Sequence, residues 1–150
     1  MNPLQSKLVL AARILLGLGF TVFGLNGFLH FLPQPPMSGP PAEFAGALFA
    51  TGYMFPLIKG TEVVTGLLLL SGRYVPLALT VLAPVVVNIL AFHAFLAPAG
   101  LAVPVVFAAL GIYLAYAHKS VFAPLLRART PFSEGSSQRP ARVGGTALST

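Results

Sequence analysis

Four long apolar runs dominate the chain and leave few ways for it to fold. They cover residues 8–32, 55–71, 74–97 and 101–117. The apolar core of a bilayer is about 30 Å thick, and a helix needs roughly 20 apolar residues to cross it. Open strands inside lipid would leave backbone groups unpaired, and the ten-residue alternating pattern of a membrane barrel is absent. The sequence therefore predicts an all-α protein, a four-transmembrane-helix bundle.

The composition supports a membrane protein and excludes several other classes. Charged residues make up 8% of the chain and apolar residues 56%, whereas soluble domains carry about 25% charged residues. The chain has no Cys, which excludes disulfides, thiol chemistry and Cys-ligated metal centres. The net charge of +6 does not indicate nucleic-acid binding, because the basic residues stand at the ends of the apolar runs and form no patch. The expected partner is the lipid bilayer.

The basic residues predict the orientation of the chain in the membrane. Lys7 and Arg13 flank the start of the first run, Arg73 follows the second, and Lys119 and four Arg residues follow the fourth. The connections 33–54 and 98–100 contain neither Lys nor Arg. Because cytoplasmic loops carry an excess of Lys and Arg, both termini are predicted to be cytoplasmic.

Two segments outside the spans, residues 42–51 and 127–150, have compositions that predict a structure for each. Residues 42–51 follow a Pro-rich stretch, with Pro41 suited to a helix start and Gly52 to a stop, and they predict a short helix at the outer interface. This helix is either an ordinary structured cap or a lid over an outward-facing pocket. Residues 127–150 are rich in Gly, Ser, Pro and Arg and predict a disordered basic cytoplasmic tail. Residues 1–126 then form the membrane domain.

Polar residues inside the predicted spans point to a site. Ionisable groups in a spanning helix are costly and usually face protein or water. Counting 1.5 Å per residue puts six polar residues in the outer half of the bilayer: Asn26, His30, Lys59, Glu62, Asn88 and His93. We expect an outward-opening polar pocket centred on Glu62.

Each of these residues also has a structural interpretation. Glu62 and Lys59, three residues apart, are able to form an ion pair without further function. The two Asn residues are able to hydrogen-bond between helices, and a His near the interface often bonds a loop carbonyl. No third ligand is spaced to complete a zinc site with two His residues, so neither a metal site nor an intrinsic cofactor is expected.

Packing signals agree with a bundle. Gly17, Thr21 and Gly24 fall on one face of the first span, a pattern that lets another helix approach closely. Pro84 lies inside the third span and is expected to kink it.

Three segments together resemble the DoxX family of small four-helix membrane proteins. They read ARILLGLGFTVFGLNGFLHFLP, ATGYMFPLIKGTEVVTGLLLLSGRYVPLAL and LAPVVVNILAFHAFLAP. The most specific match is Glu62, followed by Gly66 and Gly72, and the next is His93 at the close of the third span. The family's first helix often ends in a Gly-x-x-Lys pattern, whereas GLNG places Gly27 at the Lys position, and Lys59 is a candidate to supply that charge.

The resemblance implies a multi-pass plasma-membrane protein and, from some family members, a membrane subunit of a quinone-linked oxidoreductase. In this interpretation the pocket takes a quinone headgroup, His30 or His93 bonds a carbonyl, Glu62 moves protons, and a redox partner protein carries the electrons. The catalytic candidates are then Glu62 and His93, and the ligand-binding candidates are Asn26, His30, Lys59 and Asn88. Two alternatives stay open: a non-enzymatic membrane scaffold or assembly partner, and a small transporter, which four helices form only as a homo-oligomer.

Overall fold

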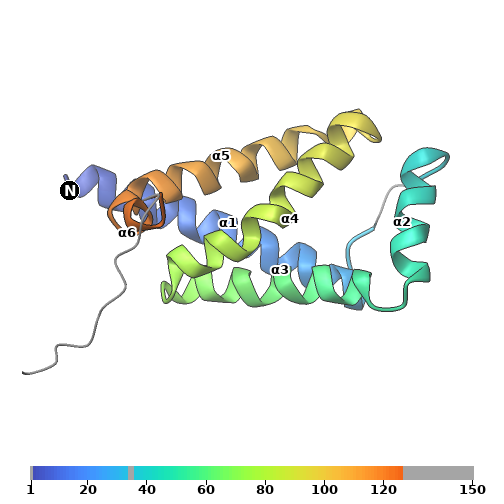
Figure 1. The fold of residues 1–150 in the computed structure, drawn as a ribbon, viewed down its shortest axis with the longest axis horizontal. Coiled ribbons are helices and arrows are strands. Elements are labelled where there is room, and N and C mark those ends of the chain that lie inside the picture. Colours follow the sequence, from blue (N-terminus) through green and yellow to red (C-terminus); the bar gives the residue numbers. More distant parts are fainter. Residues whose placement is uncertain (1, 34–35, 127–150) are drawn as a thin grey trace, which may run out of the picture.

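The computed structural model describes residues 2–33 and 36–126, and within these ranges the chain is helical and contains no strand. The elements, drawn in Figure 1, are α1 (Pro3–Leu29), α2 (Pro40–Ala50), α3 (Met54–Ser71), α4 (Val75–Phe95), η1 (Pro98–Gly100), α5 (Ala102–Ala117), α6 (Lys119–Phe122) and η2 (Ala123–Leu126). Three of them, α1, α3 and α4, are long and apolar enough to cross a membrane, and α5 is a shorter apolar helix. The prediction of an all-α fold is confirmed for the described residues, and three of the helices are candidates to span a membrane. The tail predicted over residues 127–150 lies outside the described residues.

The first helix begins and ends earlier than the apolar run suggests. The Asn2 side chain accepts a hydrogen bond from the Leu4 amide, and the Gln5 side chain accepts one from the Asn2 amide, both at 3.1 Å. This capping box satisfies amides that a helix start leaves free, so α1 starts at Pro3 rather than at residue 8. At the other end His30 adopts a left-handed conformation, with φ of 52°, which stops the helix at Leu29 rather than at residue 32.

The other helices fall close to their predicted ranges. The short helix occupies Pro40–Ala50 instead of 42–51, and the chain leaves it through Gly52, whose φ is +74°. The turn after α3 passes through Gly72, with φ of +71°, and a Cβ at that position would overlap the guanidinium of Arg13. Only a glycine therefore fits this turn. Helix α4, the third predicted span, continues through Pro84 without interruption.

The four longest helices contact one another in a ring: α1 packs on α3, α3 on α4, α4 on α5, and α5 on α1. The approach of α1 to α3 is the closest, because glycines face each other across it. A Cβ at Gly66 would lie 2.7 Å from the Thr21 amide nitrogen and 2.9 Å from the Gly17 carbonyl oxygen. The stripe of small residues on α1 therefore serves the packing role expected of it.

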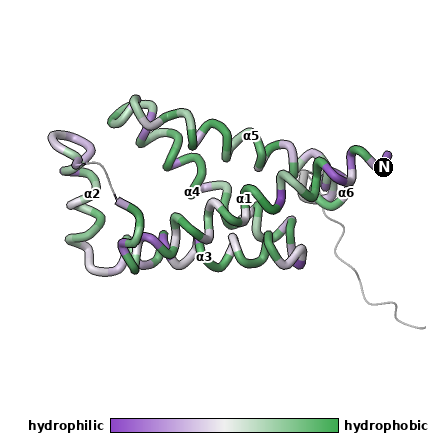
Figure 2. Tube along the Cα trace, turned by 180° about the vertical axis from the view of Figure 1, so that it is seen from behind, coloured by the Kyte–Doolittle hydropathy of each residue, from purple (hydrophilic) through white to green (hydrophobic). Residues whose placement is uncertain are grey.

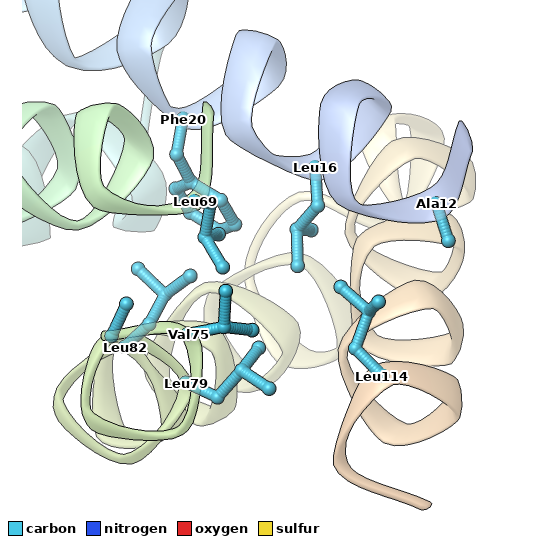
Figure 3. Packing of buried hydrophobic residues seen from close by; sticks show 9 residues of the cluster. Ala12, Leu16, Phe20, Leu69, Val75, Leu79, Leu82 and Leu114 are labelled. Atoms are coloured by element: carbon cyan, nitrogen blue, oxygen red, sulfur yellow. The ribbon is translucent and has the colours of Figure 1, made fainter. Parts of the chain in front are cut away.

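The apolar core lies where these four helices meet, and Figure 3 shows its side chains pointing toward one another. Its members are the buried residues Ala12, Leu16, Phe20, Leu69, Val75, Ala78, Leu79, Leu82 and Leu114. Along α3 the core residue Leu69 is two turns beyond Glu62, about 10 Å at 1.5 Å per residue. The core and the polar residues thus occupy successive stretches of the same helices.

Helix α2 forms the end of the molecule opposite the N-terminus and α6. It runs across the direction of the long helices (Figure 1). Figure 2 shows mostly hydrophobic long helices, with hydrophilic positions toward the two ends of the molecule. Two aromatic contacts join α2 to its neighbours. Phe49 stacks on Phe55 of α3 with ring centroids 3.9 Å apart, and Phe44 lies 5.5 Å from Phe92 of α4.

Candidate functional site

A cavity of about 320 Å³ lies between α2, α3 and α4. Most of its wall is apolar: Phe44, Ala45 and Leu48 from α2, Met54, Phe55 and Ile58 from α3, and Pro84, Val85, Ile89 and Phe92 from α4. Four polar side chains complete the wall, namely Lys59, Glu62, Asn88 and His93. Four of the six polar residues singled out in the sequence therefore line one cavity.

A second cavity, of about 340 Å³, opens between α3 and α4 but offers less chemistry. Its polar residues are Thr61 and Thr65, whose hydroxyls already donate to carbonyl oxygens one turn back on α3, at 2.8 and 2.6 Å. None of the described residues that line it is charged. We therefore place the candidate site in the cavity beside α2.

An ion pair forms the most deeply buried polar part of the site. The Lys59 ammonium donates to both carboxylate oxygens of Glu62, at 2.8 and 3.1 Å. The Glu62 side chain is 2% exposed and that of Lys59 is 21% exposed. A charge buried this far needs a partner of opposite sign, and the spacing of three residues along α3 supplies one.

Helix α1 contributes to the site through glycines. A Cβ at Gly24 would lie 3.0 Å from the Cβ of Glu62, so α1 packs closely against the base of the Glu62 side chain. A Cβ at Gly27 would lie 2.5 Å from Cγ and 2.6 Å from Cδ of Lys59, so the aliphatic chain of Lys59 occupies the space beside this glycine. The Lys59 ammonium also lies 5.9 Å from the centre of the Phe55 ring, within the range of a cation–π interaction.

The α4 side of the cavity carries an amide and an imidazole. The amide belongs to Asn88, which is exposed in the isolated chain. The Nδ1 atom of His93 lies 2.8 Å from the Ile89 carbonyl oxygen, and its ring meets Phe92 edge to face at 5.1 Å. The step of five positions from Asn88 to His93 corresponds to about 7.5 Å along α4. The polar groups on α4 are thus spread along the cavity.

The remaining two predicted site residues do not line the cavity. The Asn26 side chain is buried and binds the backbone of the loop that follows α1. Its Oδ1 accepts from the Leu32 amide at 2.6 Å, and its Nδ2 donates to the Leu32 carbonyl oxygen at 3.5 Å. His30 has an exposed side chain on the left-handed residue that ends α1. A role for either residue in ligand binding stays a prediction.

Some residues of the site carry no polar signal in the sequence. Phe44 and Phe92 close one wall, and Gly27 makes room for Lys59. The sequence predicts the short helix that bears Phe44, but not where it packs. Gly27 stands out in the sequence only as the residue that replaces a Lys in the DoxX-like pattern.

In chemical terms the cavity joins an apolar, aromatic-rich wall to a few fixed polar groups. This combination is typical of sites for small organic ligands. Among the residues that the structure describes, no three His, Asp or Glu side chains lie close enough together to hold a metal ion. The apolar wall and the fixed polar groups of the cavity suit an amphipathic molecule.

Comparisons of the chain with protein-family models, with curated proteins and with solved structures gave no match.

Proposed function

We propose that this protein crosses the plasma membrane four times, through α1, α3, α4 and α5, with both termini in the cytoplasm. The 16 residues of α5 extend about 24 Å, and thinning of the bilayer around a short helix costs little free energy. The Arg13 guanidinium packs against the α3–α4 turn at Gly72. Helix α6, which begins with Lys119, lies at the same end of the molecule as the N-terminus (Figure 1). This gathering of cations supports a cytoplasmic position for that end.

We further propose that the cavity between α2, α3 and α4 binds the headgroup of a lipid-soluble ligand of the quinone class. The observation that carries this proposal is a buried Lys59–Glu62 pair on the wall of an otherwise apolar cavity. The cavity volume of about 320 Å³ falls in the range of small-molecule sites. The DoxX-like pattern supports a membrane subunit of a quinone-linked redox system, in which a partner protein carries the electrons.

In this proposal the four polar residues have separate roles. Glu62 exchanges a proton with the ligand, because it is the one carboxylate among the described residues of the cavity wall. Lys59 holds that carboxylate in place and neutralises it. Asn88 and His93 hydrogen-bond the ligand from the α4 side, and the aromatic residues contact its ring.

A binding titration tests the proposal. Purified protein in lipid nanodiscs is titrated with decylubiquinone, using empty nanodiscs to subtract partition into lipid. Glu62→Gln is expected to weaken binding about tenfold, which corresponds to 1.4 kcal/mol. The matched control is Glu43→Gln, because Glu43 is an exposed residue of α2 that does not line the cavity.

The outcomes separate the proposed function from a scaffold role. Equal affinity of the wild type and Glu62→Gln would overturn the assignment of the ligand to this cavity. No saturable binding, together with a protein that co-purifies equally well with the wild type and Glu62→Gln, would favour a scaffold or assembly partner.

A further inference from the structure

Helix α2 covers the candidate cavity without being packed into the bundle. Phe44, Ala45 and Leu48 of this helix line the cavity, and Figure 1 shows the long helices on one side of α2 only. None of its 11 described residues is buried, whereas each of the four longest helices contributes at least two buried residues. Because burial of apolar side chains is what holds helices together, little opposes a movement of α2 away from the cavity.

The C-terminal end of α2 is fixed to α3. Phe49 stacks on Phe55 with ring centroids 3.9 Å apart and an angle of 25° between the rings. The Thr51 hydroxyl donates to the Leu48 carbonyl oxygen at 2.7 Å and accepts from the Met54 amide at 3.0 Å. The last turn of α2 is thereby connected to the first residue of α3 by hydrogen bonds as well as by ring stacking.

The N-terminal end of α2 is held less firmly. The helix begins at Pro40 after Gly39, and no side chain caps its start. Its aromatic link to α4 is the contact of Phe44 with Phe92, whose rings are tilted by 40° with centroids 5.5 Å apart. Among the described residues no hydrogen bond or ion pair joins α2 to α4. Separation of this end from α4 therefore breaks an aromatic contact and no hydrogen bond.

Glycines in open space border α2 on both sides. Gly39 has a φ of +66° and Gly52 a φ of +74°, and a Cβ at either position would meet no atom within 4 Å. Hinges are residues at the ends of helices or strands that absorb changes of φ and ψ, and glycine reaches more backbone conformations than other residues. Gly52, next to the fixed end of α2, is therefore placed to act as a pivot.

We infer that α2 is a hinged lid, which pivots at Gly52 and opens the cavity to its ligand where Phe44 parts from Phe92. The inference rests on the proposed function, since it gives the ligand of the same cavity its route of entry and exit. In the structure the lid is closed, because the two rings are in contact. Both binding and release then require α2 to open, so the lid controls the rates of binding and release rather than the affinity.

A reversible bridge across the opening tests the lid. The chain has no Cys, so in Phe44→Cys/Phe92→Cys the introduced pair supplies the only thiols. The pair is bridged in nanodiscs with a short bis-methanethiosulfonate reagent, and mass spectrometry confirms the bridge. Association and dissociation of decylubiquinone are both expected to slow by about tenfold or more, with Kd unchanged, and cleavage of the bridge by dithiothreitol should restore both rates.

The matched control is Phe49→Cys/Phe55→Cys, bridged in the same way. This pair lies at the end of α2 that stays in place, so its bridge should change neither rate. A bridge at the first pair that only filled the cavity would weaken binding without slowing dissociation. That result, or equal rates before and after bridging, would overturn the inference.

A distance measurement tests the movement without any ligand. Spin labels are attached to Glu43→Cys on α2 and to Leu77→Cys near the start of α4, both exposed positions, and their separation is measured by pulsed electron paramagnetic resonance. Phe92→Ala removes the contact that closes the lid and is expected to add a second distance for this pair. A label at Tyr53→Cys, beside the pivot, should keep a single distance to Leu77→Cys. One unchanged distance for the first pair would overturn the inference.

The outcomes distinguish the lid from the proposed function. If decylubiquinone binds in a Glu62-dependent manner while the bridge leaves its rates unchanged, the lid is wrong and the proposed function stands. If the spin labels report a second distance while decylubiquinone does not bind, the lid stands and the proposed function fails. If there is neither a second distance nor binding, both fail.

Discussion

The aliphatic chain of Lys59 lies in the space that a side chain at Gly27 would occupy, 2.5 Å from the position of its Cβ. This contact joins α1 to the ion pair on α3, because the same Lys59 donates to Glu62 at 2.8 Å. The atoms closest to Gly27 belong to the stem of the lysine rather than to its tip, so they have little freedom to move aside. The lack of a side chain at Gly27 therefore determines the position of the Lys59 ammonium.

Gly27→Ala tests this relationship. The added methyl group displaces Lys59, and overpacking of this kind costs about 1–3 kcal/mol. The free energy of unfolding in mixed detergent micelles should fall by that amount. Gly111→Ala is the control, because a Cβ at Gly111 meets no atom within 4 Å and replacing a helical glycine normally stabilises the helix. Equal effects of the two substitutions would contradict the packing described for Lys59.

The ion pair makes a second prediction. Lys59→Met leaves the buried Glu62 carboxylate without its cation, and removal of one partner from a buried pair costs about 3–5 kcal/mol. The double variant Lys59→Met/Glu62→Gln removes both charges and should recover most of that loss. Unfolding of the two single variants and the double variant measures the coupling between the residues. Additive losses would show that the two side chains do not depend on each other.

Exchange of the lysine between helices is a third prediction. Since Lys59 fills the space at Gly27, a lysine placed on α1 should reach the same region once Lys59 is shortened. Lys59→Ala/Gly27→Lys is expected to be more stable than Lys59→Ala alone by about 1.5–3 kcal/mol, the scale of a hydrogen bond to a charged group. Gly27→Lys in the presence of Lys59 is the control and should be destabilised by overlap. A double variant no more stable than Lys59→Ala would show that the two positions are not interchangeable.

The helices and the ion pair were predictable from local patterns. The helix start and stop signals at Pro41 and Gly52 placed the short helix at 42–51, and the length of the apolar run placed the last long helix at 101–117. Both lie within two residues of Pro40–Ala50 and Ala102–Ala117. The three-residue spacing of Lys59 and Glu62 put both on one face of α3, where they form the predicted pair. These features depend on neighbours along the chain.

The positions of Asn26 and His30 were not predictable in the same way. Their spacing of four residues suggests one helical face, but α1 ends at Leu29 and the chain turns at His30. Asn26 then bonds the backbone of Leu32, a partner that exists only because of that turn. The packing of Gly27 against Lys59 depends on how α1 crosses α3. The residue pattern of a single helix does not predict that crossing.

The bond from Asn26 to the loop gives a fourth prediction. Asn26→Ala leaves the Leu32 amide without this acceptor, and an unmet buried donor costs about 1–3 kcal/mol. We expect a loss of stability of that size and faster hydrogen exchange at the Leu32 amide, with no change in decylubiquinone affinity, because Asn26 does not line the cavity. A selective loss of affinity with unchanged stability would instead support the ligand-binding role predicted from the sequence.

The close approach of α1 and α3 gives the last prediction, on two glycines of the same helix. A Cβ at Gly66 would lie 2.7 Å from the Thr21 amide nitrogen and 2.9 Å from the Gly17 carbonyl oxygen. Backbone atoms cannot rotate away as a side chain does, so Gly66→Ala must separate the helices, at a cost of about 3 kcal/mol. At Gly60 a Cβ meets no atom within 4 Å, and Gly60→Ala should stabilise α3 by about 0.5–1 kcal/mol. Unfolding of both variants checks the opposite signs, and equal stability would contradict the glycine-mediated contact.

Because Gly66 is about one turn from Glu62, separation of the helices should also loosen the ion pair and weaken decylubiquinone binding in Gly66→Ala but not in Gly60→Ala.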